Sequence, residues 1–66
     1  MARDPAPGEM WRHRNGNFYV VLVIANLPDE PRYPKTVVYL GGNGETWARP
    51  FSDWHRSMTY AGVEDA

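Results

Sequence analysis

Short apolar runs alternate with turn-forming residues along the chain, and no stretch keeps a helical period over about ten residues. Residues 10–13 alternate apolar and polar side chains, which is typical of a half-buried strand. Asn15 and Gly16 follow and predict a hairpin with a type I′ turn, because this pair tolerates positive φ angles. Residues 17–25 carry β-branched and aromatic side chains on both faces, so we expect the central, most covered strand there.

Proline and glycine divide the second half of the chain. Residues 26–34 contain three prolines, which lack the amide hydrogen that a strand ladder needs, and they predict a stiff loop. The elements predicted after this loop are a strand over 36–40, a tight glycine-rich turn over 41–44, a strand over 45–49, a 3₁₀ turn over 50–54 and a short strand over 57–60.

This succession of elements predicts an all-β domain. Five short strands with one 3₁₀ turn before the last strand favour a small SH3-like barrel, and an OB-like barrel is the alternative. A closed barrel would leave no exposed sheet edge. We expect the barrel to span residues 9–61, between a flexible N-terminal arm of residues 1–8 and a flexible tail of residues 62–66.

Composition narrows the class of protein. The 66 residues include no cysteine, which excludes disulfides, thiolate zinc sites and a cysteine nucleophile and favours a reducing compartment. The longest apolar run, residues 18–25, is too short to span a membrane. Residues 1–8 lack the layout of a signal peptide. We therefore expect a soluble cytoplasmic protein without a membrane partner.

Three large aromatic residues lie close together in the second half of the chain. Trp47 and Phe51 are expected in the core, because a small barrel needs large side chains to fill its open end. For Trp54 both positions stay open: its ring could help to fill the core, but His55 and Arg56, which follow it, point to the surface, where the ring would be available for stacking.

Charge points to anion contacts rather than to bulk nucleic acid. The formal net charge is −1, and residues 10–60 hold six basic and four acidic side chains, too small an excess for a duplex-DNA binder. Arginine, whose planar fork suits phosphate and carboxylate, supplies most of the basic residues. The first and last strands of such a barrel are expected to be neighbours, which would bring the arginines of both chain ends together. The candidate ligand-binding residues are Arg12, His13, Arg14, Arg49, Trp54, His55, Arg56 and Tyr60.

No catalytic, metal or cofactor site is predicted. Ser52, Asp53 and His55 resemble a serine triad in letters only, because residues two apart in a tight turn cannot take up its geometry. His13 and His55 have no cysteine or carboxylate cluster to complete a zinc site. Residues 41–44 lack the lysine and the helix of a phosphate-binding loop.

A family resemblance covers about 45 residues of the body. It is carried by Trp11-Arg12-His13 with Gly16 and Tyr19, Ile24-Ala25, Val37-Val38-Tyr39, Gly44 and Trp47-Ala48-Arg49-Pro50. In these residues the chain resembles a small domain family of unknown function found in bacteria and their phages. It departs from that family in its proline-rich loop and in Asp53-Trp54, where the family has Met-Phe.

The resemblance implies a compact β-rich domain and a stand-alone phage or prophage product, acting in the host cytoplasm. Small proteins of this kind often occupy a host protein or sequester a small signalling molecule.

Three functions remain open at this point. The first is a non-enzymatic protein that binds a small anionic, nucleotide-like ligand between the arginines, with Trp54 or Tyr60 stacked on it. The alternative is a protein–protein interaction module that inhibits a host protein through residues 28–34, with Arg32 and Tyr33 as anchors. Single-stranded nucleic-acid binding is less favoured by the modest charge. Because a barrel of this size makes only a shallow pocket, we also expect a homo-oligomer with pockets between subunits.

Overall fold

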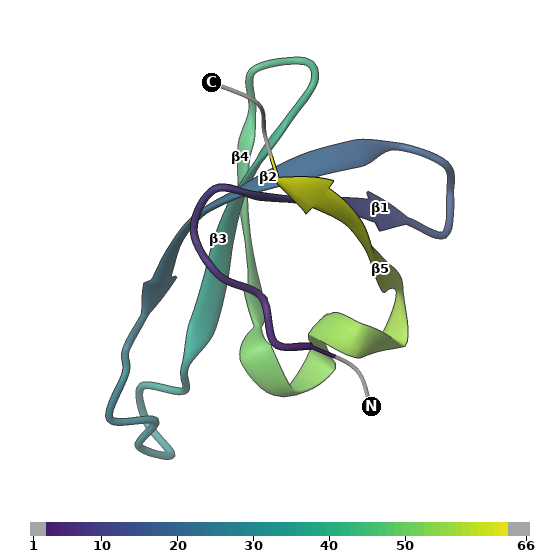
Figure 1. Ribbon diagram of the computed structural model, residues 1–66. Coiled ribbons are helices and arrows are strands. Elements are labelled where there is room, and N and C mark those ends of the chain that lie inside the picture. The colour runs from purple at the N-terminus through teal and green to yellow at the C-terminus, as the bar shows by residue number, and fades with distance from the viewer. Residues whose placement is uncertain (1–2, 64–66) are drawn as a thin grey trace.

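The computed structural model describes residues 3–63 and contains one antiparallel sheet with the strand order β4-β3-β2-β1-β5 (Figure 1). This confirms the predicted all-β, SH3-like fold, including the pairing of the first strand with the last. No helix in the described part of the chain is long and apolar enough to cross a membrane. The elements are β1 (Glu9–His13), β2 (Phe18–Ala25), β3 (Thr36–Gly41), β4 (Thr46–Pro50), the 3₁₀ helix η1 (Phe51–Arg56) and β5 (Met58–Val63).

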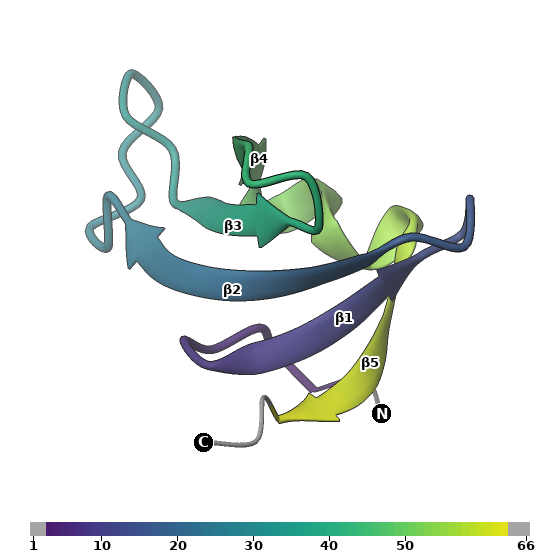
Figure 2. The same ribbon diagram turned by 90° about the horizontal axis from the view of Figure 1, so that it is seen from above.

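The sheet curls strongly but does not close. Figure 2 shows β4 and β5 on opposite sides of the molecule, with β3, β2 and β1 between them. The helix η1 spans the gap and contacts β3, β4 and β5. The predicted closure of the barrel is therefore corrected: β4 and β5 are two free edges of an open sheet.

The core lies on the concave face of the sheet, which we call the inner face. Trp11, Val21, Val37 and Tyr39 project from it and are buried, and the register pairs Val21 with Tyr39. Trp54 of η1 covers these residues, with ring centroids 5.7 Å from Trp11 and 5.0 Å from Tyr39 in edge-to-face geometry. Aromatic side chains of this size bury roughly 150–250 Å² each, so these rings supply much of a small core.

The β1–β2 hairpin has a three-residue loop. The amide of His13 donates to the Asn17 carbonyl at 2.8 Å, and the amide of Gly16 donates to the His13 carbonyl at 2.8 Å. Gly16 alone in this loop has a positive φ, 97°. The loop is therefore a type I turn followed by a left-handed glycine, which corrects the predicted type I′ turn.

The β3–β4 hairpin repeats this geometry. The amide of Gly41 donates to the Glu45 carbonyl at 2.9 Å, that of Gly44 donates to the Gly41 carbonyl at 3.0 Å, and Gly44 has a φ of 84°. The side-chain oxygen of Asn43 accepts the Glu45 amide at 3.1 Å. Two Asn-Gly turns of the same kind thus form the first and third connections of the antiparallel sheet.

The proline-containing loop between β2 and β3 projects away from the sheet (Figure 1). Asn26 and Asp29 have φ values of 57°, and the Asp29 side chain accepts the Lys35 amide at 2.8 Å. Leu27 and Tyr33 are 68% and 64% exposed. The stiff loop predicted from the prolines is thus held by turns and hydrogen bonds and presents two large side chains to solvent.

Residues 3–8 pack on the domain, although the composition of residues 1–8 predicts a loose arm; residues 1 and 2 lie outside the described residues. Pro5 is buried, and the amide of Gly8 donates to the Val21 carbonyl at 2.9 Å. Glu9 is only 4% exposed and accepts the Trp11 Nε1–H at 3.1 Å. At the other end, residues 62 and 63 continue β5, and residues 64–66 of the predicted tail lie outside the described residues.

Candidate functional site

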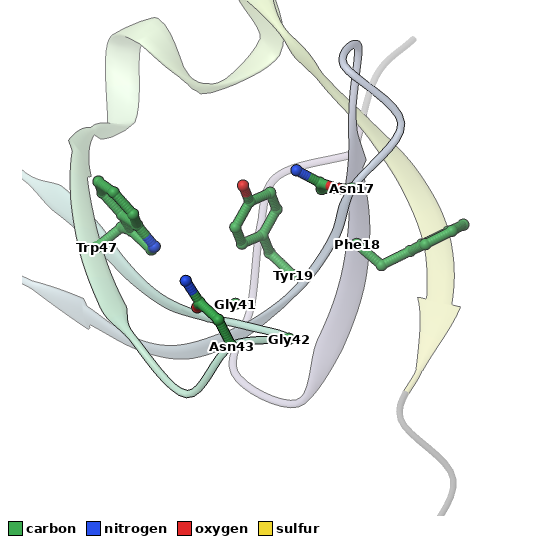
Figure 3. Close-up of a pocket in the computed structure, with 7 residues that line it drawn as sticks. All are labelled: Asn17, Phe18, Tyr19, Gly41, Gly42, Asn43 and Trp47. Carbon is green, nitrogen blue, oxygen red and sulfur yellow. The ribbon is translucent and has the colours of Figure 1, made fainter.

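An open pocket of about 520 Å³ lies on the inner face, at the end of the sheet where the two Asn-Gly hairpins turn (Figure 3). The start of β2, the β3–β4 turn and the edge strand β4 supply its walls. Its lining residues are Asn17, Phe18, Tyr19, Gly41, Gly42, Asn43 and Trp47.

Two aromatic rings face each other across the opening. Tyr19 lies against Gly41, where a Cβ atom would sit 3.1 Å from its ring, and edge-on to Tyr39 at 5.2 Å. Glycine at position 41 therefore allows the phenol ring to lie flat on the strand, and Tyr39 fixes it there. Trp47 stands on the other side and is 47% exposed. Phe18 points away from the pocket (Figure 3), so it lines the wall with its backbone.

The polar groups at the pocket include three free hydrogen-bond donors. The Asn43 side-chain oxygen already accepts the Glu45 amide, which leaves its Nδ2 free, and Figure 3 shows this nitrogen directed toward Trp47. Within residues 3–63, neither the Trp47 Nε1 nor the Tyr19 hydroxyl donates a side-chain hydrogen bond. No Asp, Glu, Lys, Arg or His lines the pocket. The site is aromatic, uncharged and rich in donors.

The arginines that the sequence grouped together lie on different faces of the sheet. Arg12 follows the inner-face residue Trp11 on β1, and side chains alternate between the faces of a strand, so Arg12 lies on the outer face, where it pairs with Thr59. Arg49 pairs with the buried Val37 and lies on the inner face. Arg56 is 80% exposed and forms an ion pair with Asp53 at 3.0 Å. Alternation along the strands thus separates Arg12 from Arg49, and the expected anion clamp is not assembled. Arg14 follows β1 in the hairpin turn.

The two tryptophans of the second half differ in exposure. Trp54 has no exposed surface, so it offers no ring face to a ligand. Its Nε1 has no hydrogen-bond partner among the described residues. Trp47, expected in the core, is half exposed and lies on β4, an edge strand that pairs with β3 on one side. Phe51 is half-buried and packs against the core, as expected.

The remaining predicted site residues have neighbours of their own. Tyr60 packs edge-on against Trp11 at 5.6 Å, and the Arg3 guanidinium covers its ring at 4.0 Å, so the ring face expected to stack on a ligand is already occupied. The His55 Nε2 lies 3.7 Å from a carboxylate oxygen of Asp4.

His13 contacts a pocket residue, because its ring centroid lies 6.4 Å from that of Tyr19. No group of three or more His, Cys, Asp or Glu residues within residues 3–63 is placed to hold a metal ion.

Comparisons of the chain with protein-family models, with curated proteins and with solved structures found no match. Sequence reasoning missed Tyr19, Asn17, Asn43 and Trp47 as site residues. The available signal was the pair of Asn-Gly turns. In an antiparallel meander the first and third turns lie at the same end of the sheet, and this brings the residues beside both turns together.

Proposed function

We propose that this protein is a non-enzymatic binding protein that holds a flat, uncharged ring carrying hydrogen-bond acceptors, such as a nucleobase, between Tyr19 and Trp47. The observation that carries the proposal is the half-exposed indole of Trp47 facing a fixed phenol across an open pocket. An exposed tryptophan at the mouth of a pocket suits stacking, which contributes about 1–3 kcal/mol per base in other proteins.

The donors of the pocket favour a ligand with carbonyl oxygens or ring nitrogens. Asn43 Nδ2 can donate to such an acceptor at the edge of the stacked ring. The Trp47 Nε1–H and the Tyr19 hydroxyl lie in the planes of their own rings, so they can donate to a group attached to the ligand ring. A ring that lacks acceptors would leave Asn43 Nδ2 without a partner, which costs affinity.

Because no charged side chain lines the pocket, we expect the ligand to be recognised through its ring. If the ligand is a nucleotide, its phosphate stays outside the pocket, and the nucleotide-like ligand expected from the arginines is recognised mainly through its base. With no nucleophile or paired acid and base at the pocket, sequestration of such a molecule is the role that fits best.

The test compares ligands that share a phosphate but differ in the ring. We expect nucleosides and nucleoside monophosphates to raise the melting temperature and quench tryptophan fluorescence, whereas ribose 5-phosphate does neither. A ligand at about 100 times its Kd stabilises the folded state by about 2.7 kcal/mol. Trp47→Ala should abolish the shift. Phe18→Ala is the matched control, because Phe18 is also exposed but points away from the pocket.

Two outcomes would contradict the proposal: an equal shift with ribose 5-phosphate, or full binding by Trp47→Ala. If no compound shifts the melting temperature, the rigid loop with exposed Leu27 and Tyr33 becomes the better-supported binding surface, and a protein partner replaces the small ligand. Binding restricted to single-stranded oligonucleotides, with strong salt dependence, would favour nucleic acid instead.

A further inference from the structure

The free edge of β4 is regular and accessible. Among the strands and η1, this strand contacts β3 and η1 alone, and Thr46, Trp47 and Ala48 are exposed. Its pairing with β3 runs without a register shift from Thr46 to Pro50. An edge of this kind presents unpaired backbone groups to another strand.

The hydrogen bonds between β3 and β4 show which backbone N–H and C=O groups of β4 face away from the sheet. The amide of Gly41 donates to the Glu45 carbonyl, and the amide of Phe51 donates to the Lys35 carbonyl. Because bonded and non-bonded pairs alternate along an antiparallel ladder, Trp47 and Arg49 also point their backbone groups toward β3.

The outward-facing residues are therefore Thr46, Ala48 and Pro50. Pro50 has no amide hydrogen to offer, which limits the accessible edge at that end. Thr46 and Ala48 each leave one N–H and one C=O free for a partner strand.

From this edge we infer that the protein forms a two-fold symmetric dimer in which β4 pairs antiparallel with β4 of a second copy, centred on Trp47. In that register Thr46 of each copy opposes Ala48 of the other, and the two pairs form four backbone hydrogen bonds. Trp47 opposes its own symmetry mate.

The charged side chains on either side of Trp47 are complementary to those of a second β4 strand paired antiparallel with it. Glu45 and Arg49 lie two residues before and two residues after Trp47, on the same face of the strand. Pairing centred on Trp47 therefore places Glu45 of each copy opposite Arg49 of the other. Neither residue forms an ion pair with another of residues 3–63. Opposite charges directly across an antiparallel pair stabilise it, and like charges destabilise it.

The other free edge does not offer a comparable surface. The pairing of β5 with β1 shifts register between Met10 and Trp11, and Gly62 of β5 has a φ of 122°. Such irregularities bend a strand and break the even spacing of its outward groups. The dimer also bears on the pocket, because directly opposed side chains have Cβ atoms about 4.5–5.5 Å apart, so the partner's Trp47 would stand beside the pocket wall.

Sedimentation velocity of the wild-type chain at rising concentration is the first test. The contact is small, so we expect dissociation in the micromolar range, with the apparent mass rising from 7.6 kDa toward twice that value. A mass that stays at 7.6 kDa up to the highest soluble concentration would overturn the inference.

Charge reversal then tests the register. Glu45→Arg and Arg49→Glu each place like charges opposite one another twice in the dimer, and each should weaken self-association about tenfold. An equimolar mixture of the two variants should associate as tightly as wild type, because every pair then has opposite charges. Arg12→Glu is the matched control: it makes the same charge change on the outer face of β1 and should leave the dimer intact.

Ala48→Pro tests the backbone contribution. It removes an outward-facing amide hydrogen without touching the ladder to β3, as Pro50 already does, so it should give a folded monomer by circular dichroism. If Ala48→Pro does not fold, the mixing of Glu45→Arg with Arg49→Glu still tests the proposed dimer. Two results would show that a different surface pairs. In the first, the wild type dimerises but the mixture of Glu45→Arg and Arg49→Glu does not regain its affinity. In the second, Ala48→Pro folds and dimerises as tightly as the wild type. These tests do not depend on the proposed ligand.

Discussion

The contrast between Trp47 and Trp54 shows what decides burial at the level of single residues. Both are large aromatic side chains in the same short segment, but one lies on an edge strand and the other on the helical turn that covers the inner face. Trp54 is enclosed by Trp11 and Tyr39, whereas Trp47 faces Tyr19 across an open pocket. The core therefore depends on Trp54, and Trp47 is free for another role.

We expect truncation to cost far more stability at Trp54 than at Trp47. Trp54→Ala should lower the free energy of unfolding by about 3–5 kcal/mol, because it leaves a large cavity in the core. Trp47→Ala should change it by less than about 1 kcal/mol, as exposed positions usually do. Urea unfolding followed by far-UV circular dichroism, at concentrations that keep the chain monomeric, measures both. If Trp54→Ala does not fold, Trp54→Phe gives a smaller loss of the same sign; equal losses at positions 47 and 54 would contradict the assignment.

Sequence reasoning at the residue scale failed where the answer depends on a distant element. Alternation along β1 placed Trp11 and Arg12 on opposite faces, which the register bears out. The burial of Trp47 depends on whether a distant segment packs over its side chain, and the sequence of residues 46–50 does not indicate such a segment. The charged neighbours of Trp54 suggest a position at the surface, but the tight turn buries Trp54 and exposes His55 and Arg56.

Elements were more predictable, because their signals are local. The strands, the proline-containing loop and the 3₁₀ turn follow from short patterns, and each predicted strand overlaps the observed one. The turn type was not predictable from Asn15 and Gly16 alone, because Asn-Gly occurs in two-residue and three-residue loops. The same type of three-residue loop in the β3–β4 hairpin places Asn43 beside Trp47 at the pocket.

The β3–β4 turn gives a prediction at this scale with two neighbouring glycines. Gly44 has a φ of 84°, so Gly44→Ala should lose about 1–2 kcal/mol of unfolding free energy through left-handed strain. Gly42 has no positive φ, and a Cβ there meets no atom within 4 Å. Gly42→Ala should therefore be neutral or stabilise the fold by about 0.4–1 kcal/mol, because it restricts the unfolded chain. Thermal unfolding of both variants checks this, and a larger loss at position 42 than at 44 would show that the turn is assigned wrongly.

For the molecule as a whole, the sequence predicted the barrel-like path and the pairing of β1 with β5, but not that the sheet stays open. Closure depends on the gap between β4 and β5, which η1 fills here. The composition of residues 1–8 also gave no indication of the contacts that residues 3–8 make. Their anchor, Glu9, is a charged residue that a simple apolar–polar pattern assigns to solvent.

Glu9 ties the first residues of the chain to the rest of the domain. Its carboxylate accepts the Ala6 amide at 2.9 Å and the Trp11 Nε1–H at 3.1 Å, and it pairs with Arg3 at 2.6 Å. Arg3 in turn covers Tyr60 of β5. A carboxylate that is 4% exposed and satisfied by three donors is a structural junction rather than a surface charge.

We therefore expect Glu9→Ala to lose about 2–4 kcal/mol of unfolding free energy, because it leaves two donors without their buried acceptor. Glu9→Gln should lose less, since an amide oxygen still accepts while the ion pair is gone. Deleting residues 1–7 should also destabilise the fold, because Gly8 and Glu9 would lose the chain that covers them. Glu45→Gln is the matched control on an exposed carboxylate and should stay within about 0.5 kcal/mol of wild type. Urea unfolding at monomeric concentration decides: wild-type stability after the deletion would mean that the first seven residues form the loose arm their composition suggests.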